Sequence, residues 1–230
     1  MAQARLKRKP KGKPDAETEE QARARMKEIL RILDREYPEA ECSLTFKTPF
    51  QLLAATILSA QCTDERVNMT TPALFAKYPT AEAMARAPTR DLEKIIQSTG
   101  FFRSKAKSLQ EASRALVERH GGEIPRTLEE LVKLRGVGRK TANVVLGVAY
   151  GVPGLVVDTH VGRISRRLGF TKVLDPVKVE RELMEVVVRE MWTHYAHLMI
   201  SHGRAICTAR RAYCEKCPIA HLCPKIGVEG

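Results

Sequence analysis

Apolar residues recur along most of this chain at the spacing of an α-helix. Between Glu17 and Pro38 they follow one another at intervals of three and four positions, and the proline ends the segment. Residues 50–60 are almost continuously apolar and rich in Ala and Leu, which is typical of a buried helix. A third segment, residues 106–117, presents one apolar face and stops at Gly121 and Gly122. Helices are therefore expected in all three places.

Strand patterns are hard to find in the same chain. Prolines at positions 72, 79, 88, 125, 153 and 176 divide it into segments of helical length with short links. Only residues 155–157 resemble a strand, and they are too few to pair usefully. The predicted fold class is all-α, and 230 residues suffice for one large or two small domains.

The charge is unevenly distributed. The net charge is +12, and half of it comes from six basic residues within the first 14 positions, which carry no acid. Residues 1–16 are predicted to form a disordered basic tail, which either seeks phosphate groups or only aids solubility. No apolar run approaches the roughly 20 residues that span a bilayer, and the N-terminus lacks the pattern of a signal peptide. We expect a cytoplasmic protein.

The most informative window is residues 131–174, which holds eight basic side chains and a single acid, Asp158. Within it, Gly136-Val137-Gly138 precedes Arg139-Lys140 and a run of small and β-branched residues. Backbone amides of such a turn, together with the free amides of the helix that follows, can bind one phosphate. An ordinary helical corner would use the same glycines, but the basic surroundings favour a nucleic-acid backbone as the ligand.

Lys140 and Asp158 are the candidate catalytic pair. A lysine amine can act as a nucleophile. Asp158 follows an apolar run and precedes a helix, so its simplest role is that of an N-cap. A capped carboxylate stays rigid, and beside an amine it would suit attack at a sugar anomeric carbon, where positive charge develops.

Four cysteines lie close together near the C-terminus. Cys207, Cys214, Cys217 and Cys223 have the spacing C-x6-C-x2-C-x5-C within the last 24 residues, which favours a metal site over a disulfide framework. The spacing alone leaves zinc and an iron-sulfur cluster open.

The segments LRGVGRKTANVVLGVAYG and VDTHVGRISRRLG resemble the helix-hairpin-helix DNA glycosylases, in particular the endonuclease III family. The resemblance extends over roughly residues 25 to 225. It implies that Lys140 is the nucleophile, that Asp158 is its catalytic partner, and that the four cysteines hold a 4Fe-4S cluster. The implied enzyme is a bifunctional DNA glycosylase and abasic-site lyase of base excision repair, which removes oxidised pyrimidines from duplex DNA.

Two further residues carry over from the same resemblance. Gln61, in LSAQCTD, would fill the gap that the extruded base leaves, and Phe101, in GFFRSKA, would wedge against the opposite strand. The implied partner is double-stranded DNA with damaged pyrimidines or abasic sites, bound by a monomer.

The resemblance also implies two lobes with DNA between them. One lobe would comprise residues 45–152, and the other residues 17–44 together with 153–230. Two alternatives stay open: a pyrimidine-dimer glycosylase on the same scaffold, and a non-catalytic helix-hairpin-helix DNA-binding module with structural zinc. The monofunctional adenine glycosylases lack the catalytic lysine, so Lys140 argues against them.

Overall fold

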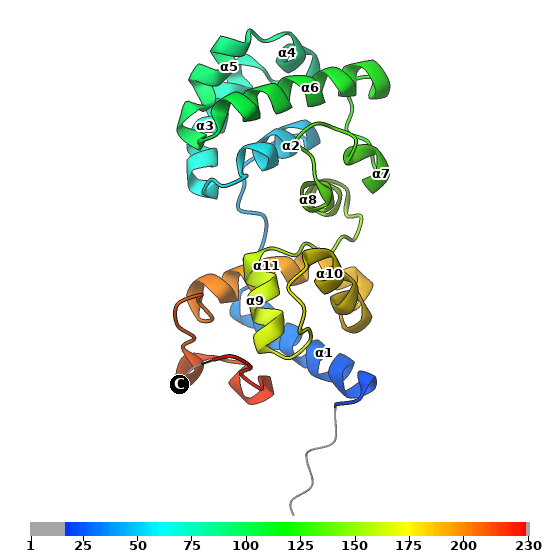
Figure 1. Ribbon diagram of the computed structural model, residues 1–230, viewed down its shortest axis with the longest axis vertical. Coiled ribbons are helices and arrows are strands. Elements are labelled where there is room, and N and C mark those ends of the chain that lie inside the picture. Colours follow the sequence, from blue (N-terminus) through cyan, green and yellow to red (C-terminus); the bar gives the residue numbers. More distant parts are fainter. Residues whose placement is uncertain (1–16, 229–230) are drawn as a thin grey trace, which may run out of the picture.

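The computed structural model describes residues 17–228, so the predicted basic tail lies outside the described residues. Within this range the chain is helical, with short links between the helices (Figure 1). The α-helices are α1 (Glu19–Glu36), α2 (Pro49–Leu58), α3 (Asp64–Lys77), α4 (Ala81–Arg86), α5 (Thr89–Ile96), α6 (Phe102–His120), α7 (Leu128–Leu131), α8 (Arg139–Tyr150), α9 (Thr159–Arg167), α10 (Pro176–Val186) and α11 (Trp192–Ala205). Four 3-10 turns accompany them: η1 (Gln97–Thr99), η2 (Arg189–Met191), η3 (Cys214–Lys216) and η4 (Ala220–Leu222).

The all-α prediction is confirmed. Helix α1 ends just before Pro38, α2 is buried on all sides, and α6 ends at Gly121, which adopts the left-handed conformation. Residues 155–157 form no strand, and the only β-type pairing within residues 17–228 is an isolated bridge between Cys207 and Ala212. None of the described helices is long and apolar enough to cross a membrane.

Two separate hydrophobic cores organise the molecule. The first is built from residues between Leu44 and Leu146, and it forms the upper lobe of Figure 1, α2 to α8. The second joins α1 to residues between Leu155 and Ile219, and it forms the lower lobe, α1, α9 to α11 and the C-terminal turns. The lower lobe therefore assembles from both ends of the chain. The exact domain boundaries stay a prediction.

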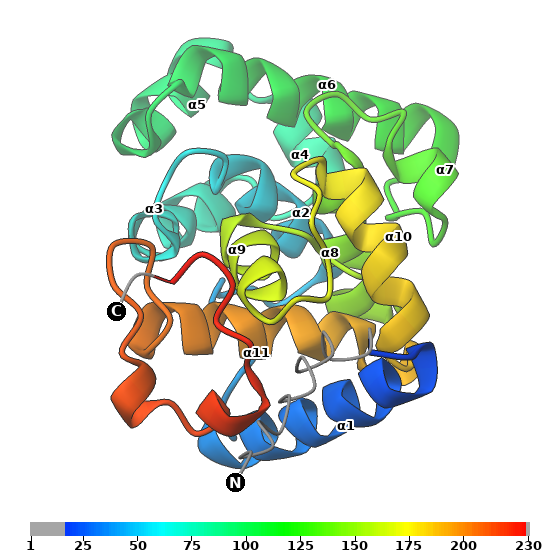
Figure 2. The ribbon, with the colours of Figure 1, turned by 60° about the horizontal axis from the view of Figure 1, so that its bottom comes forward.

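Helix α8 lies at the junction of the two lobes. Its residues Ala142, Val145 and Leu146 belong to the upper core, whereas Val144 packs against the lower core. Helix α8 contacts α2 above and α11 below. In the turned view, α9 lies in the middle of the lower lobe with α10 and α11 beside it (Figure 2). The starts of α8 and α9 are thus supported by different cores.

Candidate active site between the lobes and the cysteine pocket

The predicted hairpin is the turn between α7 and α8. Gly136 has a φ of +78°, and a Cβ there would approach the Ser108 Cβ to 2.8 Å, so both the backbone and the packing require glycine. Gly138 is the N-cap of α8, and a Cβ there would meet nothing within 4 Å. Val137, between the two glycines, is buried and packs in the upper core, which holds the turn in place.

No side chain caps the N-terminus of α8. The amides of its first turn therefore remain available to an external acceptor, at the positive end of the helix dipole. Open space at Gly138 and exposure of Gly136 allow a ligand to approach this backbone closely. The arrangement can bind an anion such as a phosphate group.

Arg139 has a partner within the protein. Its Nε and Nη2 donate to the Glu180 carboxylate at 2.8 and 2.7 Å, and this pair raises the pKa of Arg139. The Glu180 carboxylate is buried, whereas the Arg139 side chain is about half exposed. The pair joins α8 to α10, and therefore links the two lobes. Contact of Arg139 with DNA stays a prediction. The pair with Glu180 fixes the orientation of the guanidinium that would make this contact.

Lys140 and Asp158 line the same pocket, which has a volume of about 410 Å³. Lys140 projects from the first turn of α8, and Asp158 is the N-cap of α9. The Val161 amide donates to Asp158 Oδ1 at 2.8 Å, so the expected N-cap role of this aspartate is confirmed. An amine from one lobe and an anchored carboxylate from the other thus border one cavity large enough for a small organic group.

Two histidines line this pocket as well. His160 contacts Arg163 Nη2 through its Nδ1 at 3.1 Å, and burial lowers the pKa of His160. Burial also lowers the pKa of His197. A guanidinium can only donate, so the His160 Nδ1 accepts and the ring carries its proton on Nε2. Sequence reasoning assigned no role to either histidine, because their positions along the chain do not show that they share a cavity.

Gln61 and Phe101 share an unusual backbone. Within residues 17–228, the non-glycine residues in the left-handed region are Gln61 (φ 52°), Phe101 (φ 47°) and Lys225 (φ 57°). Such conformations are costly and persist only where the surrounding structure enforces them. Gln61 lines the pocket of Lys140 and Asp158, whereas Phe101 does not and is 67% exposed. Their roles on DNA stay a prediction.

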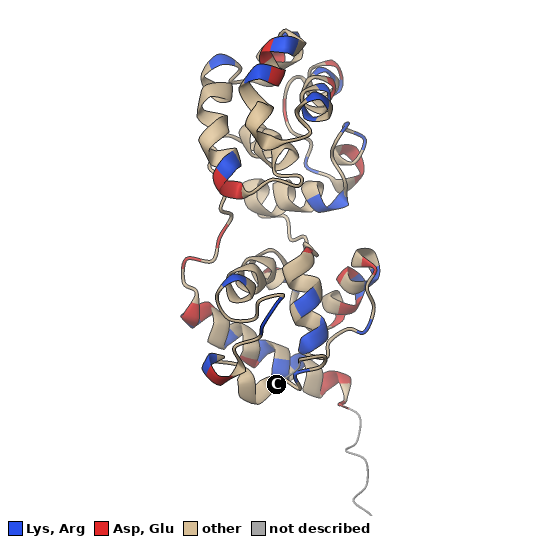
Figure 3. Ribbon diagram, turned by 60° about the vertical axis from the view of Figure 1, so that its left-hand side comes forward, with Lys and Arg blue, Asp and Glu red and all other residues tan. Residues whose placement is uncertain are grey.

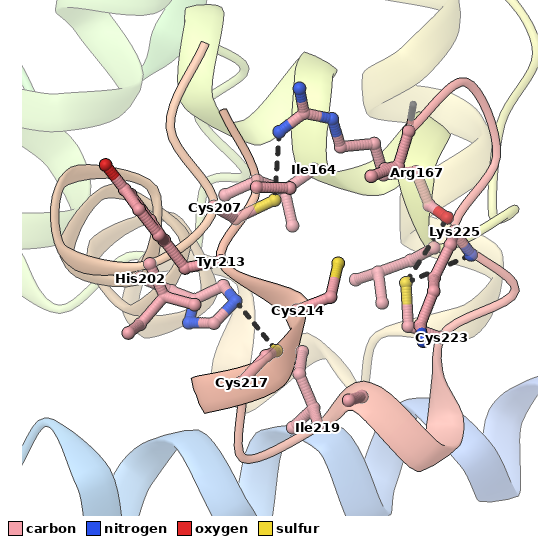
Figure 4. A pocket seen from close by; sticks show the side chains of 15 residues that line it. Ile164, Arg167, His202, Cys207, Tyr213, Cys214, Cys217, Ile219, Cys223 and Lys225 are labelled. Atoms are coloured by element: carbon pink, nitrogen blue, oxygen red, sulfur yellow. Dashed lines mark hydrogen bonds between the residues drawn. The ribbon is translucent and has the colours of Figure 1, made fainter. Parts of the chain in front are cut away.

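The four cysteines line a second pocket, in the lower lobe (Figure 4). Arg167 Nη1 donates to Cys207 Sγ at 3.1 Å, and His202 Nε2 lies 3.7 Å from Cys217 Sγ. Burial is the main cause that raises the pKa of Cys217 to about 11; a backbone hydrogen bond from Ile219 acts in the opposite direction, and the charges of the other three cysteines raise the pKa further. Lys and Arg gather in this lobe next to the C-terminal segment (Figure 3).

The donor set fits a thiophilic metal centre. Four sulfur donors surround one small pocket, and each thiolate disfavours ionisation of its neighbours unless a cation offsets their charge. Across the described residues, no three His, Cys, Asp or Glu side chains already stand in a metal-holding arrangement. The four thiols nevertheless line the same pocket.

Comparison with known proteins agrees with this geometry. The sequence profile of the HhH-GPD superfamily of base excision DNA repair proteins matches residues 54–189. Endonuclease III of Synechocystis sp. is 55% identical over 201 residues, which cover 87% of this chain and 92% of that protein.

Solved structures of endonuclease III are similar to this chain as well. A non-covalent endonuclease III–DNA complex matches with a TM-score of 0.83 at 43% identity, over 88% of this chain and 95% of the other. A trapped covalent endonuclease III–DNA intermediate matches with a TM-score of 0.83 at 44% identity, over 88% and 96%. The fold and the matched region define a base excision DNA repair protein of the helix-hairpin-helix type. Within that class, the chain belongs to the endonuclease III family.

Proposed function

We propose that Lys140 is the nucleophile with which this member of the endonuclease III family acts as a bifunctional DNA glycosylase and abasic-site lyase. Lys140 and Asp158 share one pocket, at the starts of two helices from different lobes, and this arrangement supports the assignment. The relative trapped as a covalent intermediate with DNA supports a covalent mechanism. The proposed substrates are duplexes that carry an oxidised pyrimidine or an abasic site.

The chemistry begins with the Lys140 amine. It attacks C1′ of the extruded nucleotide, and the electron pair of the N-glycosidic bond leaves with the base, which takes up a proton. Asp158 stabilises the positive charge that develops on the sugar. Opening of the sugar ring gives a Schiff base between Lys140 and C1′. Loss of a C2′ proton then expels the 3′ phosphate and nicks the strand, and water releases the lysine.

The other predicted residues are assigned to DNA binding. The amides of Gly136, Val137 and Gly138, with the uncapped first turn of α8, hold a backbone phosphate without reading bases. Gln61, on the rim of the pocket, fills the place of the extruded base. The exposed Phe101 ring inserts from the opposite side and offsets part of the unstacking cost.

We also propose that Cys207, Cys214, Cys217 and Cys223 hold a 4Fe-4S cluster. The sulfur donor set and the basic residues that surround it support this assignment over a catalytic metal. When bound, the cluster would cross-link the C-terminal segment to the lower lobe. The cysteines line a different pocket from Lys140, so a cluster held by them would take no part in base removal. The proposed lobes are residues 45–152, and residues 17–44 with 153–230.

The direct test is activity on a duplex that carries one thymine glycol. Wild-type protein should release the base and nick the strand, and Lys140→Ala should do neither. Lys94→Ala is the matched control, because Lys94 is an exposed lysine of α5 outside the pocket. If Lys140→Ala nicked the duplex like the wild type, the assignment of the nucleophile would be wrong. If the wild type acted only on cyclobutane dimers, the substrate class would be wrong.

A further inference from the structure

A buried lysine in the upper lobe has no assigned role. Lys105 lies in the second turn of α6, and only 5% of its surface is exposed. Its Nζ donates to two backbone carbonyls, Leu58 O at 2.8 Å and Thr99 O at 2.7 Å. Among the ion pairs of residues 17–228, none involves Lys105, so the amine is held by carbonyl groups. Lysine is almost never buried in this way without a reason.

The two carbonyls share a structural position. Leu58 is the last residue of α2, and Thr99 is the last residue of η1. Carbonyl groups at a helix C-terminus lack partners within the helix and carry the negative end of its dipole. One cation therefore caps two helix ends at once. Burial is the main influence on the pKa of Lys105 and lowers it, with a smaller opposite influence from Cys62.

Each capped helix end leads directly into a strained loop. Gln61 follows Leu58 by three residues, and Phe101 follows Thr99 by two. Both are non-glycine residues in the left-handed region. The backbone amide of Lys105 also donates to Phe101 O at 3.0 Å. The lysine thus contacts the backbone at or just before both of the residues that face the DNA in the proposed function.

We propose that Lys105 is a positioning residue that fixes Gln61 and Phe101 relative to each other, so that both enter the DNA stack together. The proposal rests on the proposed function, in which one residue fills the gap and the other wedges the opposite strand. A loop that holds a non-glycine residue in the left-handed region needs support from elsewhere in the fold, and Lys105 supplies it to both loops. Without the amine, two buried carbonyls would lose their donor, and the loops could move independently.

The test separates extrusion of a base from the chemistry that follows. Lys105→Met keeps an unbranched apolar chain and removes the amine. Two rates are measured on the full-length protein: release of thymine glycol from a paired duplex, and nicking of a duplex with a preformed abasic site, which has no base to extrude. We expect base release to fall about tenfold more than nicking, which corresponds to about 1.4 kcal/mol.

Lys107→Met is the matched control, because Lys107 lies two residues away on α6 and is 59% exposed. It should change neither rate. A purely structural role for Lys105 would lower both rates of Lys105→Met in parallel with its melting temperature, and that result would overturn the proposal, as would wild-type values for both.

A second variant covers the case in which Lys105→Met does not fold. Lys105→Arg keeps a positive charge and hydrogen-bond donors, but its guanidinium is larger than the lysine ammonium group and fits the site less well. This variant should again lower base release more than nicking. Equal effects of this variant on both rates would also overturn the proposal. The wild-type rates separate the two hypotheses: if the wild type failed to nick abasic DNA, the proposed function itself would be wrong.

Discussion

The starts of α8 and α9 border the same pocket but are built in opposite ways. The N-terminus of α8 is preceded by Gly136-Val137-Gly138 and has no side-chain cap. The N-terminus of α9 is closed by Asp158, whose Oδ1 accepts from the Val161 amide at 2.8 Å. One helix therefore offers free amides to an anion, whereas the other offers a carboxylate to a cation.

This difference explains how one cavity could serve DNA binding and catalysis together. In the proposed function, the open helix start binds a phosphate and carries Lys140 next to it, while the hydrogen bond at the closed start keeps Asp158 in place. Because α8 is anchored in the upper core and α9 in the lower core, the distance between amine and carboxylate depends on how the lobes fit together. Substitutions that alter only one of the two helix starts, or only the link between the lobes, test this difference.

The largest effect on activity is expected at Asp158, which closes the start of α9. Asp158→Asn retains an oxygen that can cap α9 but loses the charge, so base release should fall by about two to three orders of magnitude. Its free energy of unfolding should change by less than about 0.5 kcal/mol. Asp158→Ala should lose the same activity and, in addition, about 1 kcal/mol of stability, because the Val161 amide loses its acceptor. Wild-type activity in Asp158→Asn would leave this residue as a cap alone.

The open start is tested by its two glycines. Gly136→Ala forces a side chain into a φ of +78° and against Ser108, and should lower the free energy of unfolding by about 2–4 kcal/mol. Gly138→Ala meets no neighbour, so its stability should fall by less than about 1 kcal/mol while its affinity for duplex DNA decreases. Chemical denaturation and a DNA titration at fixed salt measure the two quantities. Equal stability losses in both variants would contradict the division of roles.

The smallest effect is expected at the ion pair of Arg139 and Glu180, which links the lobes. Glu180→Ala removes the buried partner of Arg139, and should lower the free energy of unfolding by about 1–3 kcal/mol, because the half-exposed arginine can regain water. Glu182→Ala, an exposed residue of the same helix, should stay within about 0.5 kcal/mol. Denaturant midpoints compare the two. A loss in Glu182→Ala as large as in Glu180→Ala would mean that the pair does not join the lobes.

Local pattern was enough to predict the helices and to single out candidate catalytic residues. The apolar run at residues 50–60 gave α2, the glycine pair after residue 120 marked the end of α6, and the basic window led to Lys140 and Asp158. These features depend on neighbours in the sequence, such as helical periodicity, capping and turn chemistry.

Features that depend on distant segments were not predictable. Glu180 is 41 residues from Arg139, and Lys105 is 47 residues from Leu58, so no spacing rule connects them. Lysine and glutamate are usually exposed, and nothing adjacent to them in the sequence signals burial. The left-handed backbones of Gln61 and Phe101 were missed for a related reason, since glycine is the usual residue there.

In the proposed mechanism, Lys140 forms a covalent bond to the sugar. Borohydride reduces a Schiff base to a stable amine, so incubation of the wild type with abasic duplex DNA and borohydride, followed by proteolysis and mass spectrometry, locates the linked residue. We expect one adduct, on the peptide that contains Lys140, and no adduct for Lys140→Ala. An adduct on another lysine, or an undiminished adduct in Lys140→Ala, would show that Lys140 is not the nucleophile.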